Sequence, residues 1–122
     1  MKTVFLSLTI VASLASALGA FAAPVQDKAI TASLHRIEDN SKLVHVYAHI
    51  YEWDNVDFQV DRIVTEEKKV VKALEGVADS KQKAEELQEA VKDLRSARLN
   101  QDSDHAVAAA DKVAALAHDL LK

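Results

Sequence analysis

The stretch SKQKAEELQEAVKDLRSA, residues 80–97, decides the fold class. Apolar side chains recur in it at intervals of three or four residues, at Ala84, Leu87, Val91 and Leu94. The residues between them are mostly charged. This spacing puts the apolar side chains on one face of an α-helix and the charges on the other. The stretch therefore predicts an amphipathic helix that begins at Asp79 or Ser80.

Three further segments show the same periodicity. The first runs from about Asp27 to Trp53, and its apolar face is Ile30, Leu34, Ile37, Val44, Ala48 and Tyr51. The second follows Asp54 and Asn55, and its apolar face is Val56, Val60, Ile63, Val70 and Leu74. The last extends from Ala106 to Leu121 and is rich in alanine, which favours helix but fills little volume.

Short polar residues and the one glycine of this region predict where the helices end. Asp54 is expected to cap the second helix at its N-terminus. Gly76 suits the position just after that helix, in a Schellman motif that needs a left-handed residue. Asp39, Asn40 and Ser41 are poor helix formers, yet the apolar phase continues across them. We therefore expect one long first helix.

Chain breakers are scarce in this sequence. Only one proline, Pro24, and two glycines, Gly19 and Gly76, occur among 122 residues. Tight β-hairpins depend on turn glycines, so a sheet protein is excluded over residues 25–122. The sequence predicts an all-α fold, an up-and-down antiparallel four-helix bundle.

Residues 1–22 are typical of a cleaved secretory signal peptide. Lys2 precedes an apolar run, and Ala20-Phe21-Ala22 fits the small-x-small cleavage rule. Residues 23–122 would then form a single domain, secreted to the extracellular space or cell wall, with no transmembrane segment. Removal of Lys2 with the signal peptide changes the formal charge from −4 to −5. Because nucleic acid is a polyanion and is repelled by a net acidic chain, we expect no nucleic-acid partner. With no cysteine, stability must come from helix packing alone.

All the aromatic residues after position 22 surround the turn at Asp54 and Asn55: Tyr47, Tyr51, Trp53 and Phe58. They predict either an aromatic patch that meets apolar matter, with Trp53 at the rim, or a hydrophobic plug that closes one end of the bundle. The alanine-rich last segment offers a second candidate surface, formed by Ala110, Val113 and Ala117. Either the neighbouring helices pack very close to this segment, or the small alanine side chains leave space for a ligand.

Histidines and charges supply weaker signals. His35, His45 and His49 share a face with Glu52, and the spacing of His45 and His49 is that of a two-histidine metal clip. Because no distant ligand is evident, we interpret the face as solvated, with no metal or cofactor. The run Glu66–Lys69 is interpreted as a solvent face with local ion pairs. No catalytic motif is present, so we expect no enzyme.

The pattern resembles a known family. The sequence Ala23-Pro24-Val25 lies at the end of the signal-peptide region, and the long first segment ends on Trp53. After it comes the run Val60-x-x-Ile63-x-x-Glu66-Glu67-x-x-Val70-Val71-x-Ala73-Leu74. This is similar to the fungal hydrophobic surface-binding protein A family, which is related to cell-wall galactomannoproteins. The resemblance implies a non-catalytic helical bundle that adsorbs to hydrophobic surfaces, recruits secreted hydrolases to polyesters, or binds fatty acids between helices.

Two functions follow as expectations. The first is a secreted protein that binds hydrophobic surfaces or lipids through its amphipathic helices. Its expected contacts are Tyr47, Tyr51, Trp53, Phe58, Ala110, Val113 and Ala117. The alternative is a secreted effector or interaction module that docks a host or cell-wall protein through a helix face.

Overall fold

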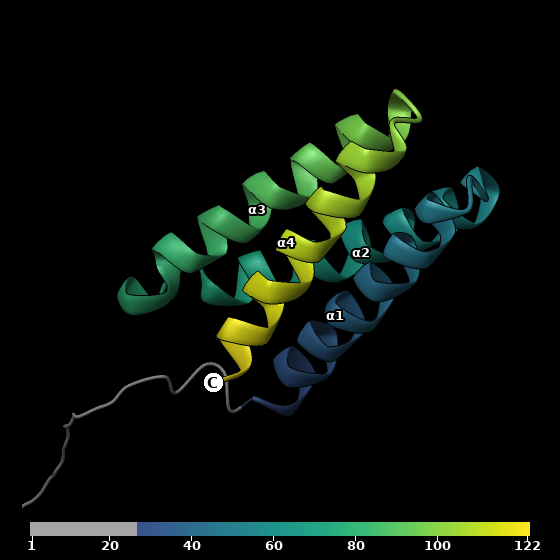
Figure 1. Cartoon of the computed structure of the whole chain (residues 1–122). Helices are drawn as coiled ribbons and strands as arrows, with labels where there is room; N and C mark the ends of the chain where they lie inside the picture. Colours follow the sequence, from purple (N-terminus) through teal and green to yellow (C-terminus); the bar gives the residue numbers. More distant parts are fainter. Residues whose placement is uncertain (1–26) are drawn as a thin grey trace, which may run out of the picture.

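The computed structural model describes residues 27–122, and the expected signal peptide lies outside them. Four helices follow one another: α1 (Lys28–His49), α2 (Trp53–Leu74), α3 (Ala78–Leu99) and α4 (Ser103–Leu121). The links between them are residues 50–52, 75–77 and 100–102, so consecutive helices run antiparallel (Figure 1). The predicted all-α, up-and-down bundle is confirmed.

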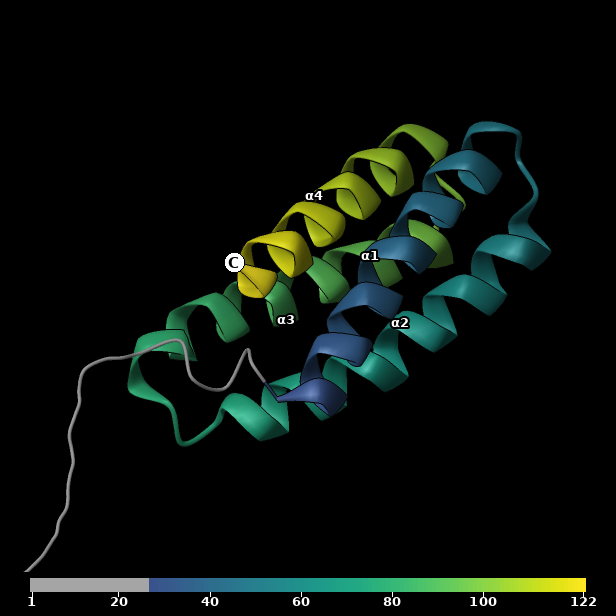
Figure 2. The ribbon, with the colours of Figure 1, turned by 90° about the horizontal axis from the view of Figure 1, so that it is seen from below.

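The helices form a closed ring in which each packs on two neighbours. α1 lies between α2 and α4, and α3 completes the ring on the other side (Figure 2). The links 50–52 and 100–102 lie at the same end, which we call the apical end (Figure 1). There the Ser103 hydroxyl donates a hydrogen bond of 2.7 Å to the Ala48 carbonyl, which ties the two turns together.

The core consists of the apolar faces that the periodicity predicted, with one exception. Tyr51 was wrongly placed on the buried face of the first helix, because it lies beyond the end of α1 and is 70% exposed. From each helix the side chains at spacings of three and four are buried, including Leu34, Ile37, Val44, Val56, Val60, Ile63, Val70, Leu74, Leu87, Val91, Leu94 and Val113. Removal of this apolar surface from water supplies the main stabilising free energy. None of the four helices has the length and apolar composition needed to cross a membrane.

Helix α1 is continuous through its weakest stretch. The Ser41 side chain is buried, and its hydroxyl donates a 2.7 Å hydrogen bond to the Ile37 carbonyl one turn earlier. This bond satisfies the polar group inside the bundle. Asn40 is also buried, and its amide nitrogen has no partner within residues 27–122.

The boundaries around the first turn differ from those predicted. α1 ends at His49, four residues early, and Trp53 opens α2 instead of ending α1. The residue at the N-cap of α2 is Glu52, whose side chain accepts no capping bond, while Asp54 lies inside the first turn. The prediction of Asp54 as the cap was therefore wrong. Asp27, where the first segment was predicted to begin, caps α1 with its side chain. The last helix begins at Ser103, three residues before the predicted Ala106, and the Asp102 side chain caps it.

Gly76 does not act as predicted. It follows the C-cap residue Glu75, but its φ is not positive, so no Schellman motif forms there. The Val77 amide bonds to the Leu74 carbonyl at 3.0 Å instead. α3 begins at Ala78, slightly before the predicted start.

Candidate functional site

Large apolar side chains are exposed at the apical end of the bundle. Leu43, Val46 and Ile50 follow one another at intervals of three and four residues on α1, and each is at least 40% exposed. Tyr51 in the first turn is 70% exposed, Phe58 on α2 is 56% exposed, and Leu99 at the end of α3 is 76% exposed. Every large apolar side chain that is exposed within residues 27–122 thus lies in the same half of the molecule.

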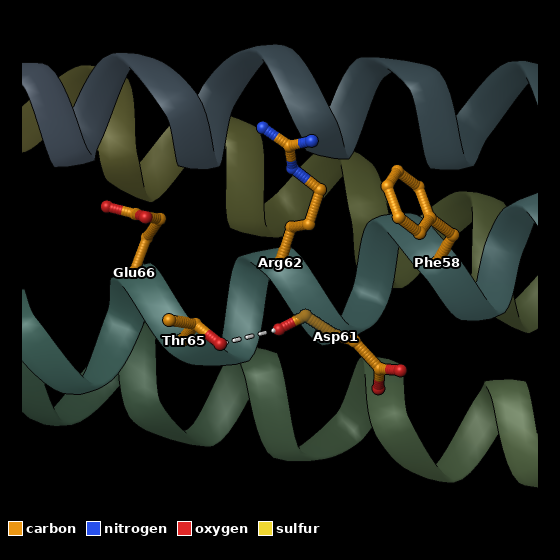
Figure 3. A pocket seen from close by; sticks show the side chains of 5 residues that line it. All are labelled: Phe58, Asp61, Arg62, Thr65 and Glu66. Carbon is orange, nitrogen blue, oxygen red and sulfur yellow. Dashed lines mark hydrogen bonds between the residues drawn. The ribbon is translucent and has the colours of Figure 1, made fainter.

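An ion pair fixes how α1 and α2 align. The Arg36 guanidinium lies 3.3 Å from the Glu66 carboxylate. Because α1 and α2 are antiparallel, Phe58, eight residues before Glu66, lies level with the residue eight positions after Arg36, which is Val44. Leu43 is the exposed neighbour of Val44 in sequence. Figure 3 shows Phe58 projecting from the side of α2 that faces α1. We define the apical patch as Leu43, Val46, Ile50, Tyr51 and Phe58.

A shallow hollow adjoins the apical patch on α2. It encloses about 450 Å³ and is lined by Phe58, Asp61, Arg62, Thr65 and Glu66 (Figure 3). The Arg62 guanidinium lies 5.5 Å from the centre of the Phe58 ring, a cation–π distance. The Thr65 hydroxyl donates to the Asp61 carbonyl at 3.1 Å. Because all five lining residues belong to α2, the hollow is an open depression on the surface beside Phe58.

Tyr51 holds an unusual backbone conformation. Its φ is 61°, the left-handed region, and the amide of Glu52 bonds to the Tyr47 carbonyl at 2.8 Å. The Tyr51 amide bonds to the Ala48 carbonyl at 3.2 Å, which completes a Schellman motif. Left-handed backbone costs a residue with a Cβ roughly 1–2 kcal/mol. A bulky ring therefore occupies a position that glycine or asparagine usually takes.

The α3–α4 turn repeats this geometry. Gln101 has φ 48°, and the Asp102 amide bonds to the Ala97 carbonyl at 3.1 Å. The Gln101 amide bonds to the Arg98 carbonyl at 3.1 Å. The two apical turns are thus the same motif, each with a residue other than glycine in the left-handed position.

The predicted aromatic cluster divides into two pairs. Tyr47 and Trp53 are half-buried and pack against the core, whereas Tyr51 and Phe58 project outward. Trp53, expected at the rim, thus contributes to the apical closure of the bundle. The cluster combines the two interpretations offered by the sequence, with one pair acting as a plug and the other belonging to a patch.

The predicted wall on α4 faces the core. Ala110, Val113 and Ala117 are fully buried among the side chains of the bundle. A ligand could contact them only if the helices separated. They are therefore not part of the outer surface that carries the apical patch.

Three members of the apical patch were missed by the sequence reasoning. Leu43, Val46 and Ile50 lie off the buried face of α1, so the core periodicity passes over them. Their own spacing of three and four residues is a second, offset apolar row. A helix with one buried face needs only one apolar row, so the second row was a signal in the sequence for exposed apolar side chains.

Carboxylates border the apical patch. Asp39 precedes Leu43 by one helical turn, Asp54 precedes Phe58 by one turn, and Glu52 follows Tyr51; all three acidic residues are exposed. Two cations lie near them. Lys42 pairs with Glu38 at 3.3 Å, whereas Arg62 lies over the ring of Phe58, at the edge of the apical patch.

The chain was compared with known protein families, curated proteins and solved structures. No family model, no curated protein and no solved structure matches this chain. The resemblance to the hydrophobic surface-binding family stays a prediction.

The histidines make pairwise contacts. The His45 ring bonds to Asp111 at 2.8 Å, His118 lies 3.3 Å from Glu38, and the centres of the His45 and His49 rings are 6.5 Å apart. Within residues 27–122, no three side chains of the metal-binding types are grouped to hold an ion. The His45 bond to Asp111 links α1 to α4.

The run Glu66–Lys69 is only partly a solvent face. Lys69 pairs locally with Glu66 at 3.4 Å, as predicted. Partial burial alone would raise the pKa of Glu66, but hydrogen bonds from Ser33, Lys69 and Arg36, with the charge of Lys69, lower it overall.

Glu67 was wrongly assigned to solvent, because it is only 7% exposed. Burial raises its pKa, and the nearby charges of Lys68 and Arg95 oppose that rise.

Proposed function

We propose that this protein is a secreted, non-catalytic protein that binds hydrophobic surfaces or lipids through the apical patch. The observation that carries the proposal is that, within residues 27–122, the exposed large apolar side chains all lie in the apical half of the bundle. Exposed apolar side chains that gather in one region of a protein are typical of a binding site, whereas exposed apolar side chains that are scattered singly are ordinary.

The closed core favours contact with the outside of the bundle. Ala110, Val113 and Ala117 are packed, while Phe58 and Tyr51 already face solvent. Adsorption through the apical patch then needs no separation of helices. Each large side chain removed from water contributes roughly 1.5–3 kcal/mol when fully buried, so several acting together give firm adsorption.

The test is depletion of the protein from solution by polystyrene beads, with hydrophilic silica as the reference surface. The triple variant Leu43→Ser, Val46→Ser, Ile50→Ser should lose most of the adsorption to polystyrene. A matched control, Ala73→Ser with Ala115→Ser, changes exposed positions outside the patch and should adsorb as the parent does. Equal adsorption by the parent and the triple variant would refute the proposal. Capture of a single extracellular protein by a chain that ignores polystyrene would favour the interaction-module alternative.

A further inference from the structure

We propose that Tyr51 is the anchor of the apical patch, and that the patch takes an uncharged apolar interface in preference to an anionic one. This inference rests on the proposed function and names the anchoring residue and the class of surface for that same site. It comes from three observations: the backbone of Tyr51, the exposure of its ring, and the carboxylates around the patch.

The fold gains little from a tyrosine at position 51. The residue is 70% exposed, and within residues 27–122 its side chain makes no hydrogen bond, ion pair or ring contact. Its φ of 61° is unfavourable for a bulky side chain. The hydrogen bonds that close the Schellman motif come from the backbone, so glycine would form the same turn without the strain.

The turn places this ring where an interface would meet it first. Tyr51 is the middle residue of the link 50–52, directly after Ile50 and at the apical end of the bundle (Figure 1). Tyrosine has an apolar body and a polar tip, which suits the boundary between water and an apolar phase. Strained residues held in place by their surroundings commonly serve binding. Here the strain presents an aromatic ring outward.

The shape and charge of the patch indicate the kind of surface. Its members are exposed positions on α1, on α2 and in the turn between them, so they offer an open surface that fits a broad interface better than a slender ligand. Three carboxylates, Asp39, Glu52 and Asp54, border it against one cation, Arg62, that lies over Phe58. The net negative charge of this rim is repelled by anionic lipid headgroups. An uncharged interface carries no such repulsion.

The α3–α4 turn provides a matched control in the same molecule. Gln101 occupies the same position of the same motif, with φ 48°, but it belongs to no apolar patch. Both Tyr51→Gly and Gln101→Gly remove left-handed strain, so each should raise the melting temperature by about 2–6 °C. Only Tyr51→Gly removes the anchor.

The experiment measures partition onto phosphatidylcholine vesicles and onto vesicles with an equal share of phosphatidylglycerol. The parent protein and Gln101→Gly should bind phosphatidylcholine alike and more tightly than the anionic mixture. Tyr51→Gly should bind phosphatidylcholine about tenfold more weakly than the parent does, and Tyr51→Trp, which keeps an aromatic ring, should bind more tightly than Tyr51→Gly.

Several outcomes would overturn the inference. Equal binding by Tyr51→Gly and the parent removes Tyr51 as the anchor, and tighter binding to the anionic vesicles removes the preference for an uncharged surface. A dimer of the parent that Tyr51→Gly dissociates would assign the patch to a second copy. If the parent binds neither these vesicles nor polystyrene, the proposed function itself fails.

Discussion

Replacing the buried Glu67 by leucine is expected to stabilise the bundle at neutral pH by about 1–2 kcal/mol. Glu67 lies on the core face of α2, between the turns that carry Ile63 and Val70, and only 7% of it is exposed. A leucine there would add apolar burial and remove a buried charge. The lost attraction to Lys68 and Arg95 subtracts little, because both cations are exposed.

The same residue gives a pH dependence of known sign. Burial raises the pKa of Glu67 in the folded state above its ordinary 4.5, so the folded state holds the proton more tightly than the unfolded state. The contribution of Glu67 to stability is therefore most favourable below pH 4.5. It declines as the pH rises through the raised folded pKa, and the penalty is complete above it.

Thermal unfolding followed by circular dichroism measures both effects. For a domain of this size, the neutral-pH gain corresponds to a rise in melting temperature of about 4–12 °C. Glutamine has nearly the same shape as glutamate but no charge. The difference in melting temperature between Glu67→Gln and the parent should therefore grow as the pH rises above 4.5. Two results would show that burial of the Glu67 charge does not destabilise the bundle. One is a Glu67→Leu protein that melts at a lower temperature than the parent at neutral pH, and the other is a gain in melting temperature for Glu67→Gln that does not change with pH.

Four other substitutions have expected outcomes in unfolding by urea or heat. Glu66→Gln should behave oppositely to Glu67→Gln: the lowered pKa means that Glu66 stabilises above pH 4.5, so its loss costs stability at neutral pH and little in acid. Leu94→Ala should cost about 2–5 kcal/mol, because the side chain is fully buried. Asp102→Ala should cost about 1 kcal/mol through loss of the bond to the His105 amide. Gly76→Ala should stabilise by about 0.4–1 kcal/mol, since its φ is not positive and an added Cβ meets no atom within 4 Å. A melting temperature that moves against any of these signs would contradict that assignment.

The helical fold was predictable because its signal is repeated along the chain. Each segment carries its own apolar row. Apart from Tyr51, which lies past the end of α1, these rows are buried in the structure, as Leu87, Val91 and Leu94 show on α3. Short links then leave antiparallel neighbours as the simplest arrangement. No long-range information was needed for this step.

The turns were harder to predict, because the left-handed positions do not contain glycine. Tyr51 and Gln101 take positive φ, while Gly76, the residue best suited to it, does not. Ring closure at the apical end, where Ser103 bonds to Ala48, accompanies the two strained turns. Such a tertiary constraint overrides local preference and is not visible in a short window of sequence.

The candidate site was only half predictable for a related reason. Its aromatic members, Tyr51 and Phe58, stood out by type and position. Leu43 and Val46 looked like ordinary helix residues, since their exposure depends on which row of α1 faces the core. The burial of Glu67 also escaped prediction, because its charged neighbours suggested solvent.

The depth of single tryptophans in vesicles of brominated phosphatidylcholine tests most directly whether the apical patch enters an apolar interface. In a Trp53→Phe background, tryptophan is placed either at Tyr51, within the apical patch, or at Ala73, an exposed position at the far end of α2. If the apical patch enters the interface, bromine quenches the emission at position 51 and leaves position 73 unchanged. Equal quenching at both positions, or quenching at position 73 alone, would contradict the account.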